Sequence, residues 1–193
     1  MTMSVGVLAL QGAFAAHAEV LRALGQRVLE VRTPADLDGV DALVLPGGES
    51  STMSHLLVTS GLLEPVARAI SGGMPAMGTC AGLIVLAASI ADGREDQHCL
   101  GVLDVSVRRN AYGRQRDSFE ADLVLPGGGM RGVFIRAPRI ESVGPEVEVL
   151  ARHGEDPVLV AQGNVLGATF HPEISGSALL HEYFVSMAHE RKA

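Results

Sequence analysis

A cysteine between two glycines is the residue of this sequence best suited to covalent chemistry. Residues 78–82 read GTCAG, after a short apolar strand expected at residues 75–77 and before a helix expected at residues 83–90. This is the cysteine form of the G-x-S-x-G turn, which lifts a nucleophile above the edge of a sheet. Helix and strand come close together there, so both flanking positions favour glycine. Cys80 is therefore a candidate nucleophile at a helix start, where backbone N–H groups favour a thiolate. The alternative is a small buried hydrophobic residue.

A histidine and a glutamate two residues apart can activate such a thiol. His171 and Glu173 follow a strand expected at residues 165–170, and in an extended chain residues two apart point the same way. The carboxylate then orients the imidazole, which takes the thiol proton. Zinc binding is the alternative, but the sequence offers no plausible set of three or four ligands. The remaining histidines are expected at the surface or as satisfied core residues: His17, His55, His98, His153, His181 and His189.

A glycine-rich turn supplies candidates for binding a developing oxyanion. Residues 46–50 read PGGES and follow a strand expected at residues 42–45, at the sheet edge where ligands bind in parallel sheets. Glycine lets a backbone N–H of this turn, around Gly48, point at an oxyanion, and the N–H of Ala81 is a second donor. The alternatives are a plain turn before a helix and a phosphate loop. Phosphate binding is disfavoured because the turn lacks lysine and Glu49 would repel the anion.

Two arginines are candidates for holding a substrate carboxylate. Arg109 lies in the densest basic cluster, residues 108–116, and Arg136 ends an apolar strand expected at residues 133–136. Either guanidinium can bind a carboxylate with two parallel hydrogen bonds, although such a cluster can also be a solvated loop. Residues 127–132 match G-x-G-x-x-G, but a strand follows them rather than a helix, so we expect a flexible loop and no dinucleotide site.

The expected elements define an α/β fold. In the first half, strands at 4–10, 27–31, 42–45 and 75–77 alternate with helices, which predicts a doubly wound, mostly parallel sheet with helices on both faces. The second half adds strands, partly as an antiparallel hairpin, and a final helix capped by Ser177. These strands are expected at residues 101–107, 119–125, 133–136, 147–152, 158–162 and 165–170. We expect a single domain, residues 1–193.

Composition narrows the classes of function. The net charge of −7 and the absence of a basic run argue against nucleic acid and anionic membranes as partners. Two cysteines make no disulfide framework, so we expect a reducing, cytoplasmic location. Residues 69–91 carry no charge and are long enough to span a bilayer, but their glycines and a proline break them into separate elements of a buried core.

With these residues placed, the sequence resembles the class I glutamine amidotransferases, which have a flavodoxin-like fold. Residues 78–82 look like their nucleophile elbow, and residues 171–173 look like their histidine and glutamate. Within that class the chain is most similar to the glutaminase subunits of pyridoxal 5′-phosphate synthase. The resemblance spans residues 5–184, and its discriminating stretches are residues 8–12, 45–51, 109–115, 118–120 and 133–138.

The resemblance implies glutamine hydrolysis through a thioester, with Cys80, His171 and Glu173 as catalytic residues and no cofactor or metal. It implies that glutamine is held by Gly48, Glu49, Ser50, Arg109, Ile135 and Arg136. It also implies a large hetero-oligomer with a synthase subunit, which receives the ammonia and activates the glutaminase on docking. Residues 11–12 are expected on the docking face. Residues 95–99 and 127–129 depart from the family pattern.

Two other functions compete with this interpretation. One is a glutaminase serving another synthase, such as imidazole glycerol phosphate synthase, against which residues 109–115 argue. The other is a non-catalytic α/β module or a redox sensor in which Cys80 is oxidised rather than acylated. The presence of both His171 and Glu173 argues against the second alternative.

Overall fold

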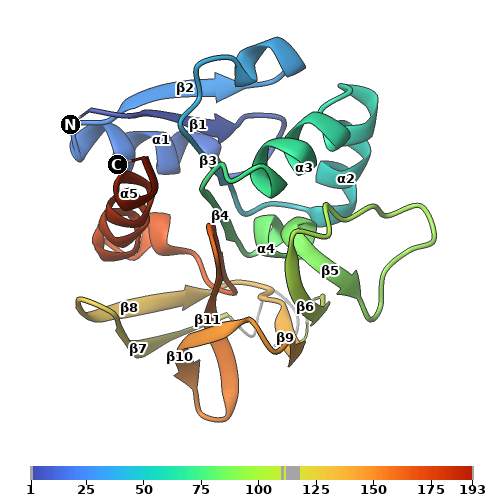
Figure 1. Cartoon of the computed structure of the whole chain (residues 1–193). Helices are drawn as coiled ribbons and strands as arrows, with labels where there is room; N and C mark the ends of the chain where they lie inside the picture. Colours follow the sequence, from blue (N-terminus) through green and yellow to red (C-terminus); the bar gives the residue numbers. More distant parts are fainter. Residues whose placement is uncertain (1, 110, 112–117, 193) are drawn as a thin grey trace.

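The computed structural model describes residues 2–109, 111 and 118–192. Its centre is a seven-stranded sheet in the order β10-β11-β12-β4-β3-β1-β2 (Figure 1). Five neighbouring strands of this sheet are parallel: β2, β1, β3, β4 and β12. At the edge beyond β12, β11 pairs antiparallel with both β12 and β10. Their bounds are β1 Ser4–Leu8, β2 Arg27–Val31, β3 Ala42–Leu45, β4 Ala76–Thr79, β10 Glu148–His153, β11 Asp156–Gln162 and β12 Val165–Ala168.

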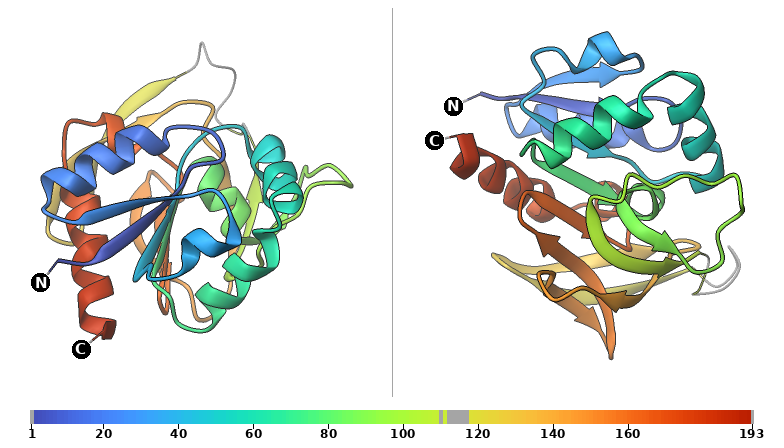
Figure 2. Two further views of the ribbon diagram at one scale, coloured as in Figure 1. Left: turned by 90° about the horizontal axis from the view of Figure 1, so that it is seen from above. Right: turned by 45° about the vertical axis from the view of Figure 1, so that its right-hand side comes forward.

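Alternating side chains of the central strands enter two separate apolar cores. In β3, Leu43 and Leu45 join the core that holds residues of α2, α3 and α4, while Ala42 and Val44 join the core that holds residues of α1 and α5. Figure 2 shows these two groups of helices on opposite sides of the sheet. The prediction of a mostly parallel sheet covered on both faces is thus confirmed. The helices are α1 Phe14–Ala23, η1 Pro34–Leu37, α2 Ser50–Thr59, α3 Leu63–Ser71, α4 Ala81–Leu86, η3 Pro172–Ile174 and α5 Leu179–Lys192.

Two small sheets lie beside the main one. One contains β5 Ala87–Ile90, β6 Leu103–Arg108 and β9 Arg139–Val143, and the other is the antiparallel hairpin of β7 Phe119–Leu125 and β8 Gly128–Phe134. Strand β12, from near the end of the chain, lies between β11 and β4. Because β4 precedes Cys80 and β12 leads to His171, this pairing brings the two parts of the predicted site to neighbouring strand ends.

Three expectations about local structure are wrong. The helix expected at residues 83–90 ends at Leu86, and the rest forms β5, which pairs with β6. An uninterrupted apolar run suits a buried helix and a buried strand equally, so periodicity could not separate them. Residues 127–129 are not a flexible loop: they close the β7–β8 hairpin and begin β8, which ends at Phe134 rather than at Arg136. Strand β9 was not predicted.

No helix in the described ranges is long and apolar enough to cross a membrane. The uncharged segment 69–91 instead contains parts of α3, β4, α4 and β5. The turn between α3 and β4 falls at Gly72, Gly73 and Pro75, as expected of such breakers, whereas α4 passes directly into β5 without a glycine or proline.

Candidate active site

The backbone holds Cys80 in a sharp turn between β4 and α4. Cys80 has φ 49° and ψ −105°, a conformation that residues with a side chain rarely adopt and that is typical of nucleophile elbows. The helix packs so close to the sheet that a Cβ on Gly82 would lie 2.0 Å from the carbonyl oxygen of Leu45. A Cβ on Gly78 would in turn meet the Gly82 carbonyl group, 2.6 Å from its carbon. The expected need for glycine at both positions is therefore met.

His171 lies against this turn, with Glu173 behind it. The backbone N–H of His171 donates to the carbonyl of Val133 at 2.8 Å, and His171 Nδ1 is 2.8 Å from Glu173 Oε1. The predicted pairing is therefore present, but the expected extended geometry is wrong. Pro172 begins the turn η3, because its fixed φ suits the first position of such a turn, and the turn brings the carboxylate to the ring.

The electrostatics around His171 favour its protonated form. Burial opposes the charge, but hydrogen bonds with Cys80 and Glu173, together with their negative charges, raise the pKa of His171 to about 10. Burial likewise opposes the charge of Glu173, yet the hydrogen bond with His171 and the nearby histidines lower the pKa of this carboxyl. Nδ1 of His171 is occupied by Glu173, so Nε2 is the ring nitrogen available to the thiol. The arrangement suits a thiolate and imidazolium pair.

A cavity of about 180 Å³ opens over the cysteine, and it is small beside the pockets that hold drug-sized ligands. It brings together all six residues that the resemblance assigns to glutamine, along with Cys80 and His171, whereas Glu173 and Ala81 do not line it. Cys80 is 5% exposed, and its Sγ is 4.0 Å from the Ile135 carbonyl oxygen. The lining residues are Gly48, Glu49, Ser50, Cys80, Ile84, Arg109, Ile135, Arg136 and His171.

Glu49 caps the helix that follows the glycine turn. Its carboxylate accepts hydrogen bonds from the backbone N–H groups of Ser51 at 3.1 Å and Thr52 at 2.7 Å. Partial burial opposes the charge, but these bonds and those of the two hydroxyl groups lower the pKa of Glu49. On the other side, Gln11 donates to the Glu49 carbonyl at 3.3 Å and accepts from the Glu49 N–H at 3.2 Å. The Gly48–Glu49 backbone is thus held from two sides.

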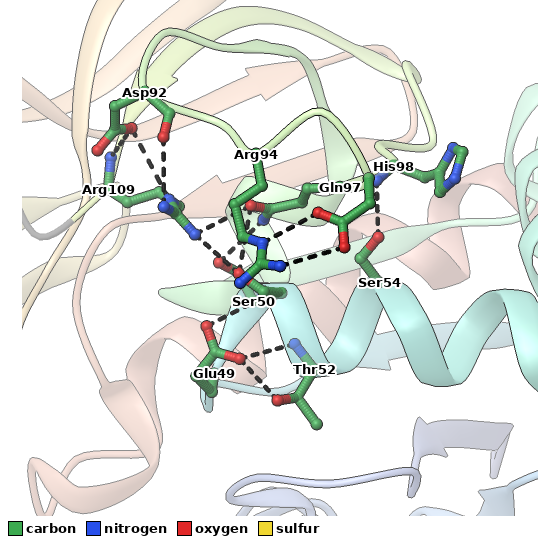
Figure 3. Close-up of polar contacts among 11 residues, drawn as sticks. Glu49, Ser50, Thr52, Ser54, Asp92, Arg94, Gln97, His98 and Arg109 are labelled. Atoms are coloured by element: carbon green, nitrogen blue, oxygen red, sulfur yellow. Dashed lines mark hydrogen bonds and ion pairs between the residues drawn. The ribbon is translucent and has the colours of Figure 1, made fainter.

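Arg109 lines the cavity, and a network of polar side chains that includes Gln97 holds it there (Figure 3). Its Nη1 donates to Ser51 Oγ at 2.8 Å and to Gln97 Oε1 at 3.0 Å. The Gln97 amide nitrogen donates to Ser50 Oγ at 3.1 Å, and Asp92 accepts the Arg109 backbone N–H at 2.8 Å. Gln97 was missed because it lies in residues 95–99, which depart from the pattern of the resembled family.

Replacing Gln97 with leucine is expected to weaken glutamine binding. Arg109 and Ser50 would lose a shared amide partner, leaving polar groups to find other partners. We expect KM for glutamine to rise about tenfold while kcat changes little, as for a group that acts in binding. Steady-state kinetics of the synthase-bound enzyme measure this, with exposed Glu95→Leu on the same loop as the matched control. An unchanged KM in Gln97→Leu would contradict the role.

Two buried histidines make the fold sensitive to acid. Burial lowers the pKa of His17 to about 4. The charge of Glu173 raises this pKa, and the charge of His171 lowers it further. Burial also lowers the pKa of His181 to about 3, helped by His17 and opposed by Glu173. The pKa of a histidine in the unfolded chain is about 6.5. At pH values between the two folded-state pKa values and about 6.5, the unfolded chain binds more protons than the folded chain, so the free energy of unfolding rises with pH. The stability that depends on keeping these histidines neutral is fully present above about pH 6.5. It is lost as the pH falls to about 4 for His17 and to about 3 for His181.

Urea unfolding at pH 7 and pH 4.5 tests this expectation. We expect the free energy of unfolding to fall by on the order of 5 kcal/mol over that interval, about half of it from each histidine. His181→Leu, which removes one of the two groups, should show a smaller fall than the unchanged chain. An identical pH dependence in both proteins would mean that His181 does not contribute.

Part of the predicted basic stretch has no described structure: residues 110 and 112–117 lie outside the described ranges. Within those ranges, no group of three or more histidine, cysteine, aspartate or glutamate side chains could hold a metal ion. Both cysteines are free, Cys80 buried and Cys99 half-buried.

Comparison with known proteins agrees with this combination of fold and site. A solved structure described as a glutamine amidotransferase superposes with a TM-score of 0.91 at 49% identity, covering 96% of this chain and 98% of that one. The fold of this chain is therefore that of the glutamine amidotransferase class.

The sequence also identifies one family within the glutamine amidotransferase class. Residues 7–190 match the SNO glutamine amidotransferase family, and the chain belongs to that family. It is 54% identical over 191 residues to "Pyridoxal 5′-phosphate synthase subunit PdxT" of Leifsonia xyli, covering 97% of this chain and 96% of the relative. The protein of the same name in Mycobacteroides abscessus is 51% identical over 189 residues, with 97% and 98% covered. The resemblance noted in the sequence is thus confirmed.

Proposed function

We propose that this chain hydrolyses L-glutamine to L-glutamate and ammonia through a thioester on Cys80, and passes the ammonia to a pyridoxal 5′-phosphate synthase subunit. The prediction of a glutaminase that serves pyridoxal 5′-phosphate (vitamin B6) synthesis is confirmed by the family and by the name of its relatives. The observation that carries the chemical proposal is Cys80 and His171 lining one cavity with Arg109 and Glu49.

In the first half of the reaction, the Cys80 thiolate attacks the side-chain amide carbon of glutamine. Backbone N–H groups of the Gly48 turn and of Ala81 would hold the oxyanion, each donor contributing about 3 kcal/mol. The imidazolium of His171 gives its proton to the amide nitrogen, the C–N bond breaks and ammonia leaves. Glu173 keeps the ring oriented, and the product is a γ-glutamyl thioester.

In the second half, neutral His171 takes a proton from water, which attacks the thioester carbon. The C–S bond breaks, glutamate leaves and the thiolate and imidazolium pair is restored. Cys80 therefore acts as nucleophile and leaving group, and His171 as acid and then base.

The cavity also suits the charged end of the substrate. Glutamine carries an α-carboxylate and an α-ammonium group, and the cavity wall offers Arg109 and Arg136 for the first and Glu49 for the second. Gly48, Ser50 and Ile135 complete the proposed binding set. This placement distinguishes the free amino acid from a glutamine within a peptide, which lacks both charges.

A synthase subunit is the proposed partner, in a large hetero-oligomer in the cytoplasm. The relatives bear the name of such a subunit, and free ammonia is a wasted product unless an acceptor is close. Gln11 contacts the Gly48–Glu49 backbone, so a partner that docks at residues 11–12 would act directly on the oxyanion turn. We further propose that residues 1–193 form one glutaminase domain, since both halves contribute strands to the main sheet.

The test is glutamate release from glutamine with and without the purified synthase subunit, with Cys80→Ala as the blank. Strong stimulation by that subunit is expected. Cys80-dependent activity that ignores this subunit but responds to the imidazole glycerol phosphate synthase partner would overturn the proposed pathway. Absence of Cys80-dependent activity with either partner would overturn the chemistry.

A further inference from the structure

Behind the catalytic pair lies a chain of buried polar side chains with no role in the chemistry above. His17 of α1, Thr79 of β4 and His181 of α5 are all 0% exposed. His17 Nδ1 lies 2.9 Å from His181 Nε2, and His17 Nε2 lies 3.1 Å from Thr79 Oγ1. Burying imidazoles among apolar side chains is unfavourable unless they are hydrogen-bonded. The hydrogen bonds of these histidines therefore call for an explanation beyond packing in the core.

His17 also faces the far oxygen of Glu173. Its Nε2 is 3.4 Å from Glu173 Oε2, whereas Glu173 Oε1 is bonded to His171. Oε2 is buried and makes no hydrogen bond within the described residues. A carboxylate oxygen in such a place needs a donor, and His17 is the side chain placed to provide one. Hydrogen bonds of catalytic groups are often long before substrate binds and shorten afterwards.

The contacts of His181 select the tautomer of His17. If His17 carries its proton on Nε2, this N–H points toward Thr79 and Glu173, and Nδ1 accepts from Nε2–H of His181. His181 Nδ1, which is buried without a partner in the described residues, is then an unprotonated nitrogen. In the opposite arrangement it would be a buried N–H without an acceptor, and a lone pair of His17 would face the carboxylate. The first arrangement avoids both costs.

His17 contacts both segments that carry the proposed catalytic residues, β4 through Thr79 and η3 through Glu173. Thr79 immediately precedes the nucleophile Cys80, and Glu173 orients the base His171. The ionisable groups that act on His17 are Glu173 and His171 on the side of η3 and His181 on α5. With its pKa near 4, His17 is neutral at pH 7, so it supplies a donor without cancelling the charge of Glu173.

We propose that His17 is a positioning residue that holds the Glu173 carboxylate, and through it the His171 ring, in line with Cys80, while His181 fixes the tautomer of His17. The inference rests on the proposed thioester chemistry. It explains why two histidines that touch no substrate lie buried in a row with the triad.

Two polar variants of His17 separate an effect on the position of Glu173 from an effect on core packing. In His17→Gln the side-chain amide nitrogen can reach the place of Nε2, so the donor to Glu173 is kept. In His17→Asn the amide reaches only the place of Nδ1, so that donor is lost. Leu21→Ala, on the same buried face of α1, serves as the control for loss of packing alone.

Kinetics of the synthase-bound enzyme give the first readout. We expect kcat of His17→Asn to fall about tenfold to a hundredfold, by analogy with the loss of residues that orient metal ligands through hydrogen bonds. KM for glutamine should stay within about twofold because no cavity contact changes. We expect the alkaline limb of the pH profile to move to lower pH, since a loosened Glu173 holds the proton of His171 less well. His17→Gln should keep most of kcat and the original limb.

The rate at which a glutamine-like diazoketone alkylates Cys80, followed by mass against pH, gives a second readout that needs no turnover. His17→Asn should shift this profile, and Leu21→Ala should lower the melting temperature without shifting it. Equal behaviour of the glutamine and asparagine variants, or a shift in Leu21→Ala as large as in His17→Asn, would overturn the proposal. Failure of the unchanged chain to turn over glutamine would instead overturn the proposed function.

Discussion

Replacing Cys80 with alanine is expected to reduce glutamine hydrolysis by about 10⁴-fold or more, to the rate seen without the glutaminase. Removing the nucleophile of a triad costs about as much as removing the whole triad, because its members act as a unit. Among the described residues that line the cavity beside His171, Cys80 is the only one with a thiol. Glutamate release with the synthase subunit present measures the effect.

Cys99 provides the matched control. It is the second cysteine of the chain, and its Sγ contacts the carbonyl oxygen of Ile84 at 3.6 Å rather than the cavity. Burial raises the pKa of the Cys99 thiol to about 11, so it is protonated and unreactive at neutral pH. Cys99→Ala should retain nearly full activity, and equal losses in both variants would point to general damage rather than to a lost nucleophile.

Replacing His171 with asparagine is expected to cause the second large loss, about 10³-fold or more in kcat. General acid and base catalysis contributes about 10²- to 10⁴-fold. Here one group acts as the acid for the departure of ammonia and as the base for the attack of water. The variant also removes the cation that faces Cys80, so alkylation of Cys80 by the diazoketone at pH 7 should slow as well. Stopped assays of both rates on the same preparation measure the two effects.

His153→Asn is the control for this variant. His153 is exposed on β10 and does not line the cavity, so its replacement should leave kcat and the alkylation rate unchanged. If His171→Asn slowed turnover but left the alkylation of Cys80 unchanged at every pH, His171 would act after acylation and would not be the partner of the thiol.

The fold could largely be predicted from the sequence because its parallel strands are short apolar runs separated by clear turn signals. Strands β2 and β3 have the predicted ends, and the ends of β1, β4, β6 and β12 differ by one or two residues. Prediction failed where pairing decides the structure. Residues 87–90 become a strand because β6 lies beside them, and β9 depends on the same small sheet.

The proposed catalytic residues could be picked out because the chemistry that points to them is local in sequence. Cys80 lies in a five-residue turn, and His171 and Glu173 lie two residues apart. The residues that support them could not, because their partners are far along the chain. His17 and His181 are 164 residues apart, and Gln97 and Ser50 are 47 apart. His17 and His181 are buried and hydrogen-bonded to each other, as expected of core histidines, but their position behind Glu173 could not be predicted from the sequence.

The most direct test of the central claim is the mass of the intact chain after rapid acid quenching of the synthase-bound enzyme with glutamine. The proposed mechanism predicts a species heavier by one γ-glutamyl group, attached to the peptide that contains Cys80, formed before glutamate accumulates and absent from Cys80→Ala. Glutamate release with no adduct on Cys80 at any quench time, together with turnover by Cys80→Ala, would contradict the thioester mechanism.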